Sequence, residues 1–167
     1  MVTAYISLGT NLGNKLQNIK QALNYIETRC GKITRESSIY ETAPWGFESN
    51  EKFLNQVVGL RTELTAEQLL VELLAIERAM GRTRKPLDGY ASRIIDLDIL
   101  FYDQLILEKE NLKIPHPHIQ HRKFILVPLM EIAASYRHPV FNKTIDQLEK
   151  DCTDHLSIKI LESKGGV

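Results

Sequence analysis

The chain has 167 residues, of which 43% are hydrophobic and 25% charged, a composition typical of a globular protein with a sizeable core. Its 21 Lys and Arg residues balance 21 Asp and Glu residues, which argues against a general nucleic-acid-binding protein. Two cysteines imply no disulfide framework, and the sequence shows neither a signal peptide nor an apolar run that could span a membrane. We therefore expect one cytoplasmic domain over residues 1–162, followed by a frayed tail at 163–167.

Strands and helices are expected to alternate along the chain. Strand-like runs lie at residues 2–8, 32–40, 53–60 and 93–101. Helices are expected after the capping signals at Asn14–Gln17, Thr65–Gln68 and Thr144, and also around residues 123–134. Gly31 and Gly81 are placed to end the first two helices, and residues 9–14 read as a turn.

The order strand, helix, strand, strand, helix, strand is that of the ferredoxin-like α+β folds. We expect the first two helices to cover one face of an antiparallel sheet, with extra helices at the C-terminal end. Such folds host many functions, so the chemistry must be argued from particular residues.

The segment Arg93–Phe101 places two carboxylates on one side of an apolar strand. Asp96 and Asp98 alternate with Ile95, Leu97, Ile99 and Phe101, so the aspartates are expected on one face and the four apolar residues on the other. Leu100 continues the aspartate face. At a rise of about 3.3 Å per residue, the aspartate Cα atoms lie about 6.6 Å apart, within reach of one or two cations. Two close carboxylates favour Mg²⁺, although a half-solvated edge strand has the same pattern.

The loop before this strand is basic. Arg82, Arg84, Lys85 and Arg93 lie in it, and guanidinium groups match phosphate oxygens, so the loop and the aspartates together suit a triphosphate with Mg²⁺. A solvated basic loop is the plain alternative. The turn at 9–14 carries no Walker or dinucleotide-binding motif, so it is interpreted as a tight turn rather than a phosphate loop.

Two further polar features admit more than one interpretation. His116, His118 and His121 could suggest zinc, but one histidine that donates to a phosphate oxygen fits better, and a surface loop competes with both. Asn55 lies in an apolar strand on the same face as Phe53. Its amide either reads the edge of a flat heterocycle or is a satisfied structural group.

Together these motifs resemble the 6-hydroxymethyl-7,8-dihydropterin pyrophosphokinase family, and the resemblance runs from Tyr5 to about Ile132. The matching segments, as they stand here, are Gly9-Thr10-Asn11-Leu12-Gly13, Tyr40-Glu41-Thr42-Ala43-Pro44, Phe53-Leu54-Asn55, Glu77, Gly81-Arg82-Thr83-Arg84, Arg93-Ile94-Ile95-Asp96-Leu97-Asp98-Ile99 and Pro115-His116. The Arg-x-x-Asp-x-Asp core, in this order with the others, is highly specific.

The resemblance implies transfer of pyrophosphate from ATP to the pterin hydroxymethyl group, with release of AMP, in folate biosynthesis. It implies that Asp96 and Asp98 bind two Mg²⁺ ions that neutralise charge and align the reacting groups. ATP and the dihydropterin are the expected partners of a monomer, with no nucleic acid and no membrane. No protein base is evident as the proton acceptor.

The resemblance also assigns the other site residues. Those with an implied catalytic role are Arg82, Arg93, Asp96 and Asp98. Those implied to contact ATP are Glu77, Arg84, Arg93, Ile99, His116 and Arg122, with Glu77 and Ile99 near the nucleoside. Those implied to contact the pterin are Thr42, Ala43, Trp45, Phe53, Asn55, Tyr90 and Phe124. The loop from Arg82 to Arg93 is implied to close over the site.

The chain departs from the family pattern in the basic loop and in the loop that carries Ala43 and Trp45. Gly89 stands where a cation is usual, Ala91-Ser92 replaces Gly-Pro, and Ala43 and Trp45 replace proline and leucine. The basic loop is one residue longer than in some relatives. These changes bear on closure and product release rather than on the metal ligands. The rival interpretations are an Mg²⁺-dependent nucleotide phosphohydrolase, which needs no pterin pocket, and a binding module without catalysis.

Overall fold

A computed structural model of the chain describes residues 1–42, 52–81 and 94–162. The strands are β1 (Val2–Thr10), β2 (Lys32–Glu36), β3 (Ile39–Thr42), β4 (Phe53–Thr62), β5 (Asp96–Tyr102), β6 (Leu107–Lys109), β7 (Leu112–Ile114) and β8 (Ile158–Glu162). The helices are α1 (Lys15–Arg29), α2 (Ala66–Ala79), α3 (Lys123–Ala133) and α4 (Ile145–Asp151), with a 3-10 turn η1 (Ile119–His121). Within these ranges no helix is both long and apolar enough to cross a bilayer. The tail predicted at 163–167 lies outside them.

The main sheet is antiparallel and runs in the order β5-β1-β4-β3-β8, with β2 also paired to β4. Strands β6 and β7 form a separate hairpin. The elements follow the predicted strand-helix-strand-strand-helix-strand order through β5, except that the second strand is divided into β2 and β3. The ferredoxin-like α+β class is therefore confirmed.

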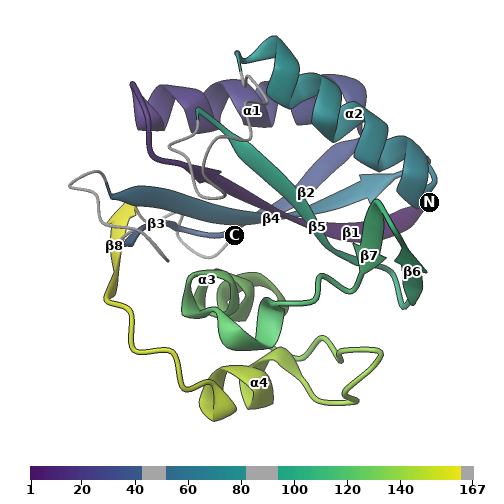
Figure 1. Cartoon of the computed structure of the whole chain (residues 1–167), viewed down its shortest axis with the longest axis vertical. Helices are drawn as coiled ribbons and strands as arrows, with labels where there is room; N and C mark the ends of the chain where they lie inside the picture. Colours follow the sequence, from purple (N-terminus) through teal and green to yellow (C-terminus); the bar gives the residue numbers. More distant parts are fainter. Residues whose placement is uncertain (43–51, 82–93, 163–167) are drawn as a thin grey trace.

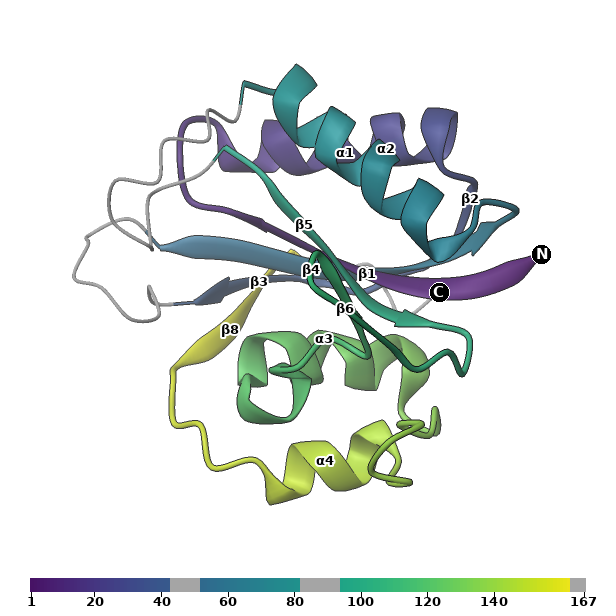
Figure 2. The same cartoon turned by 45° about the vertical axis from the view of Figure 1, so that its right-hand side comes forward.

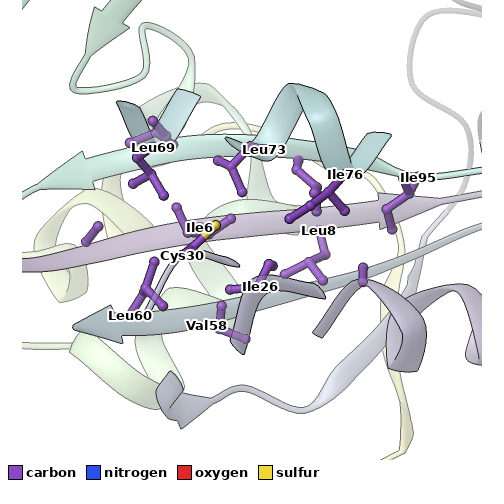
Figure 3. Close-up of a cluster of buried hydrophobic side chains, with 14 of the residues drawn as sticks. Ile6, Leu8, Ile26, Cys30, Val58, Leu60, Leu69, Leu73, Ile76 and Ile95 are labelled. Atoms are coloured by element: carbon purple, nitrogen blue, oxygen red, sulfur yellow. The ribbon is translucent and has the colours of Figure 1, made fainter. Parts of the chain in front are cut away.

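Helices lie on both sides of the sheet. Figures 1 and 2 show α1 and α2 against one face, as predicted, while α3 lies against the other face with α4 packed outside it. We call these the α1/α2 face and the α3 face. On the α1/α2 face, Ile6 and Leu8 of β1 meet Ile26 of α1 and Leu73 of α2 in a buried cluster (Figure 3). This apolar layer fixes the sheet on which the polar residues are arranged.

The helix ends follow the sequence signals. Thr65 and Gln68 form a reciprocal capping box at α2, and Thr144 forms another at α4. The Asn14 side chain accepts from the Gln17 amide at the start of α1. Gly31 follows the C-cap of α1 at φ 154°, and only glycine fits there because a Cβ would lie 2.2 Å from the Arg61 carbonyl oxygen.

The strand predicted over residues 32–40 is interrupted at Ser37 and Ser38. The Ser37 amide donates to the Val57 carbonyl, and the Val57 amide donates to the Ser37 hydroxyl. The Ser38 amide and hydroxyl both donate to the carboxylate of Glu131 on α3, at 3.0 and 2.8 Å. These side-chain bonds replace the regular ladder, so β2 and β3 pair with β4 as two separate strands.

The prediction for Phe101 was wrong. Ile99 pairs with Ile6 and Phe101 pairs with Tyr5, so Leu100 is an extra residue in β5 and forms a bulge. The alternation continues as predicted to Leu100, which is buried on the α3 face, but the bulge turns Phe101 to that face as well. Asp96 and Asp98 therefore lie on the α3 face, opposite to Leu97 and Ile99.

Candidate functional site

Three residues far apart in the sequence form one row across β4, β1 and β5, near the C-terminal end of β1. In the strand register, Asn55 of β4 and Asp96 of β5 both pair with Gly9 of the middle strand β1. Direct cross-strand partners point to the same face, here the α3 face. With strands about 4.8 Å apart, the Cα atoms of Asn55 and Asp96 are separated by about 10 Å. Gly9 was predicted in the turn, but β1 extends through Thr10, so Gly9 is the central floor of this row.

Gly9 leaves room beside the Asn55 amide. A Cβ on Gly9 would lie only 3.3 Å from Oδ1 of Asn55. A side chain at position 9 would therefore crowd the Asn55 amide and fill the space above the middle strand. The glycine keeps the backbone bare between the amide and the carboxylate.

The Asn55 side chain is held in one orientation. Its Nδ2 donates to Oγ1 of Thr42 on β3 at 2.7 Å, and both side chains are buried. The Nδ2 donor of Asn55 is therefore satisfied within the protein, which is consistent with the interpretation of Asn55 as a structural residue. A side chain held in one orientation is also suited to the recognition of a heterocycle, so both interpretations of Asn55 stay open. Phe53 pairs with Thr42 in the register, at the entrance to β4.

Asp96 and Asp98 are half-buried on the same face of β5, with Asp98 opposite Ser7 of β1. Among the described residues, His, Cys, Asp and Glu side chains do not gather in groups of three or more that could hold a metal. Zinc sites use three or four protein ligands, whereas Mg²⁺ is commonly held by one or two carboxylates together with substrate phosphates and water. The aspartate pair fits Mg²⁺ as a donor set.

His116 lies beside this pair with a defined tautomer. Its amide donates to the Leu100 carbonyl at 3.0 Å, and its Nδ1 accepts from the His118 amide at 3.2 Å. Burial, and then the positive charge of Arg122, lowers the pKa of His116 to about 4, while Asp96 acts in the opposite direction. The ring is neutral at pH 7 and carries its proton on Nε2, so it is a hydrogen-bond donor without net charge.

Arg122 and Phe124 lie at the start of α3. The guanidinium carbon of Arg122 is 5.6 Å from the centroid of the Phe124 ring, a cation–π arrangement. Phe124 is partly buried against the α3-face core. These residues add a fixed cation and an aromatic surface to the face that carries the aspartates.

Glu77 and Ile99 lie on the other side of β5. Glu77 is 2% exposed, and its Oε2 accepts the Leu97 amide at 2.8 Å, so this carboxylate braces the start of the aspartate strand. The Ile99 side chain is part of the α1/α2 core. The structure does not bring these two side chains to the row formed by Asn55, Gly9 and Asp96.

Several predicted site residues lie outside the described parts of the chain. They are Ala43, Trp45, Arg82, Arg84, Tyr90 and Arg93, together with Gly89, Ala91 and Ser92 of the predicted closing loop. Their roles stay predictions.

The sequence interpretation missed Glu131, which connects α3 to β3. Besides Ser38, it accepts a short hydrogen bond from the Tyr40 hydroxyl, and Tyr40 pairs with Asn55 in the register. Burial and this carboxylate raise the pKa of Tyr40. The available signal was a single acid inside the apolar run of residues 124–133.

The chain is similar to proteins of one enzyme family. Residues 5–134 match the family described as 7,8-dihydro-6-hydroxymethylpterin-pyrophosphokinase. The 2-amino-4-hydroxy-6-hydroxymethyldihydropteridine pyrophosphokinase of Porphyromonas gingivalis is 43% identical over 141 residues, covering 83% of this chain and 95% of that protein. The Haemophilus influenzae protein of the same name is 38% identical, covering 96% of this chain and 99% of its own.

Other relatives are longer. The chain is 40% identical to the Pneumocystis carinii "Folic acid synthesis protein fol1" over 90% of its own length but spans only 20% of that protein. A Plasmodium falciparum HPPK-DHPS structure with pteroate has a TM-score of 0.74 at 21% identity, with 89% of this chain and 44% of that chain covered. This structural likeness bears on the fold.

Proposed function

Because the chain belongs to the 7,8-dihydro-6-hydroxymethylpterin-pyrophosphokinase family, we propose that it transfers pyrophosphate from ATP to the hydroxymethyl group of 6-hydroxymethyl-7,8-dihydropterin. AMP is released, and the product enters folate biosynthesis. The observation that carries the proposal is the row across the sheet, in which a fixed amide and a carboxylate share one face on either side of a bare glycine.

The row separates two kinds of recognition. Asn55, oriented by Thr42, would bind the pterin edge, and Asp96 with Asp98 would lie at the phosphates. With about 10 Å between the Cα atoms at the ends of the row, the hydroxymethyl group would lie above Gly9, between the two. Catalysis by such a site would come mainly from positioning of the acceptor oxygen against the phosphorus.

Asp96 and Asp98 are the residues that would hold Mg²⁺, and we propose two ions. When bound, the ions neutralise charge on the triphosphate and its transition state.

Cationic and neutral donors would complete the phosphate site. His116 would donate from Nε2 to a phosphate oxygen, in the tautomer that the His118 amide imposes. Arg122 would add a charge that its contact with Phe124 holds in place. Arg82, Arg84 and Arg93 are proposed as further phosphate ligands, with Arg82 and Arg93 acting in catalysis.

The remaining predicted residues would form the pockets for the pterin ring and for the nucleoside of ATP. Phe124 would stack on the pterin ring, with Phe53, Thr42, Ala43, Trp45 and Tyr90 around it. Glu77 and Ile99 are proposed near the nucleoside. Because the Ile99 side chain is in the α1/α2 core, its contact with a ligand would use the backbone.

A metal-dependent phosphohydrolase is the alternative function, because it would use the same aspartates with water as the acceptor. The Thr42–Asn55 pair favours the pterin acceptor, since a hydrolase needs no buried amide at this distance from its carboxylates. A binding module would retain ligand affinity without turnover.

The test is to identify the nucleotide products formed from ATP and Mg²⁺ with and without 6-hydroxymethyl-7,8-dihydropterin. We expect AMP only when the pterin is present. Asp96→Asn should abolish AMP formation, whereas Asp151→Asn, at an exposed surface position, should not. AMP or ADP formed without pterin would support the hydrolase, and bound ATP without any turnover would support the binding module.

We further propose that the enzyme is a monomer in the cytoplasm. Cys30 and Cys152 are both free thiols, which is consistent with a reducing compartment. Light scattering after size exclusion should give the mass of one chain, and a dimer mass would contradict this.

A further inference from the structure

A second polar hollow lies at the opposite end of β1 from the candidate site. It has a volume of about 720 Å³ and lies on the α3 face, between the sheet and the C-terminal end of α3. None of the residues that line it belongs to the proposed pterin, ATP or metal sites. Thr3 and Tyr5 line it, whereas Gly9 lies about 13 Å beyond Tyr5 along the same strand. We call it the Arg35/Arg61 groove.

The floor of the groove is a second row across the sheet, centred on a glycine. Tyr5 of β1 and Arg35 of β2 both pair with Gly59 of β4, and Thr3 pairs with Arg61 in the adjoining row. Gly59 itself is buried. A Cβ there would be 3.5 Å from both Tyr5 and Thr34 and 3.6 Å from Arg35, so the Tyr5 ring and the Arg35 stem close over the glycine and form the surface of the floor.

The charge of the groove favours an anion. Within the described parts of the chain, neither Arg35 nor Arg61 forms an ion pair, and the bond recorded for Arg35 is a donation to the Ile132 carbonyl at 3.1 Å. Glu131 is the only carboxylate among the lining residues, and it already accepts bonds from Ser38 and Tyr40.

The helix end beside the groove does not oppose an anion strongly. The last carbonyls of α3 are already used: that of Ile132 by Arg35, that of Ala133 by the Tyr136 amide and that of Ala134 by the Asp146 amide. Their partial negative charge is therefore offset within the protein. Among the residues that the structure describes, the two guanidinium groups are the positive charges at this surface without an ion-pair partner.

The opposite wall is apolar and aromatic. Met130 and Ile132 come from α3, and the Tyr5 and Tyr136 rings meet edge to face with centroids 5.4 Å apart. A concave site with an apolar wall and a few polar groups is typical of small-molecule binding, and the volume is in the usual range.

We propose that the Arg35/Arg61 groove binds a small planar aromatic acid. The ring would lie over the Tyr5 ring and the stem of Arg35, which cover Gly59, and the carboxylate would lie between the two guanidinium groups. Arginine suits both contacts, because its planar fork pairs with carboxylates and its face stacks on rings. This inference does not rest on the proposed function.

The test uses benzoate, with benzamidine as a probe of the same ring and opposite charge and inorganic phosphate as an anion without a ring. Backbone amide shifts in ¹H–¹⁵N spectra of the full chain report binding at Gly59 and Arg61. We expect saturable benzoate shifts there in the millimolar range, and none with benzamidine. Equal shifts from benzamidine, or no saturation, would overturn the proposal, and phosphate binding as tight as benzoate would overturn the assignment of a ring.

Three variants localise the effect. Arg61→Gln should weaken benzoate binding about tenfold, through loss of a charge-assisted contact. Arg35→Gln should weaken it similarly, and its spectrum should show an intact fold because the glutamine amide is neutral and can still donate hydrogen bonds at this surface. Arg29→Gln removes an exposed arginine from α1 and should leave the affinity unchanged. An unchanged affinity in both Arg61→Gln and Arg35→Gln would overturn the proposal.

Discussion

The two faces of the sheet carry different kinds of residues on the same strands. On the α1/α2 face, β1, β4 and β5 present Ile, Leu and Val side chains to two helices. On the α3 face, the same strands present glycines and polar side chains at both ends, with an apolar patch between. Helix α3 has 11 residues and a length of about 16 Å, whereas β4 has 10 residues and spans about 33 Å. One short helix cannot cover the strands, and polar rows occupy the parts that it leaves.

The contrast between the two faces can be tested first on the apolar face, where a substitution should affect stability and not activity. Leu73→Ala should lower the free energy of unfolding by about 2–5 kcal/mol, because the side chain is fully buried between α2 and the sheet. The turnover rate per folded molecule should be unchanged. Val71→Ala, at a 59% exposed position of the same helix, should change stability by no more than about 0.5 kcal/mol. Urea unfolding measures both, and a loss of turnover in folded Leu73→Ala would show that the faces are not separable.

On the polar face, Asn55→Ala should raise the KM for the dihydropterin by about 10- to 100-fold, because the fixed amide that we propose for the pterin edge is lost. The KM for ATP should change little, since the proposed phosphate site is at the other end of the row. Steady-state kinetics with each substrate varied gives both values. Asn24→Ala, on the exposed side of α1, is the control. Equal changes in both KM values would mean that Asn55 supports the whole site rather than the pterin.

A smaller effect is expected at the polar link between α3 and β3. Glu131→Gln should lower stability by about 1–2 kcal/mol, because the new amide NH₂ group faces the Ser38 and Tyr40 donors. In a domain of this size, the melting temperature should fall by about 2–8 °C. Glu108→Gln, at an exposed position of β6, should leave it unchanged. A melting temperature equal to that of the parent protein would show that the Glu131 hydrogen bonds do not stabilise the position of β3.

A further effect depends on pH and concerns His138, in the turn between α3 and α4. Its Nδ1 accepts the Val140 and Phe141 amides, and burial lowers its pKa from 6.5 to about 4. The imidazole binds a proton more readily in the unfolded chain than in the folded protein. The contribution of neutral His138 to the free energy of unfolding is therefore complete above about pH 6.5 and decreases as the pH falls toward 4.

The measurement is urea unfolding at pH 7.5 and pH 5. The parent protein should lose more stability on acidification than His138→Asn, whose carbonyl can accept the same amides without titrating. His155→Gln, at an exposed position, should behave as the parent protein does. An identical pH dependence in the parent and His138→Asn would exclude this turn as the source.

Local signals in the sequence predicted much of the fold. The limits of α2 follow from the Thr65–Gln68 box and Gly81, and the alternation in β5 correctly placed Asp96 and Asp98 together. The errors occur where a distant partner decides the outcome. Ser38 leaves the ladder because of Glu131, 93 residues away, and Phe101 changes face because of a bulge in the register with β1. The local periodicity of the sequence gives no information about the Ser38–Glu131 contact or about the bulge.

The same limit applies to the candidate site. Asn55 and Asp96 were each identified from their own strands, but their common row depends on β1 lying between β4 and β5. Strand β8 was missed because it is a short edge strand, and Ile160 and Leu161 are both largely exposed in it. Without a buried face, its alternation gives little signal.

The order of the strands also has a consequence for biosynthesis. Gly9 is made first, Asn55 joins it when β4 pairs with β1, and Asp96 arrives only when β5 is added to the other edge of β1. Domains generally fold as their chain emerges from the ribosome, N-terminal part first. A nascent chain that has paired β1 with β4 would already hold the amide half of the row, yet would lack its carboxylates. The order of synthesis therefore separates the two halves of the row in time, and the row is complete only after β5 has docked at the edge of the sheet.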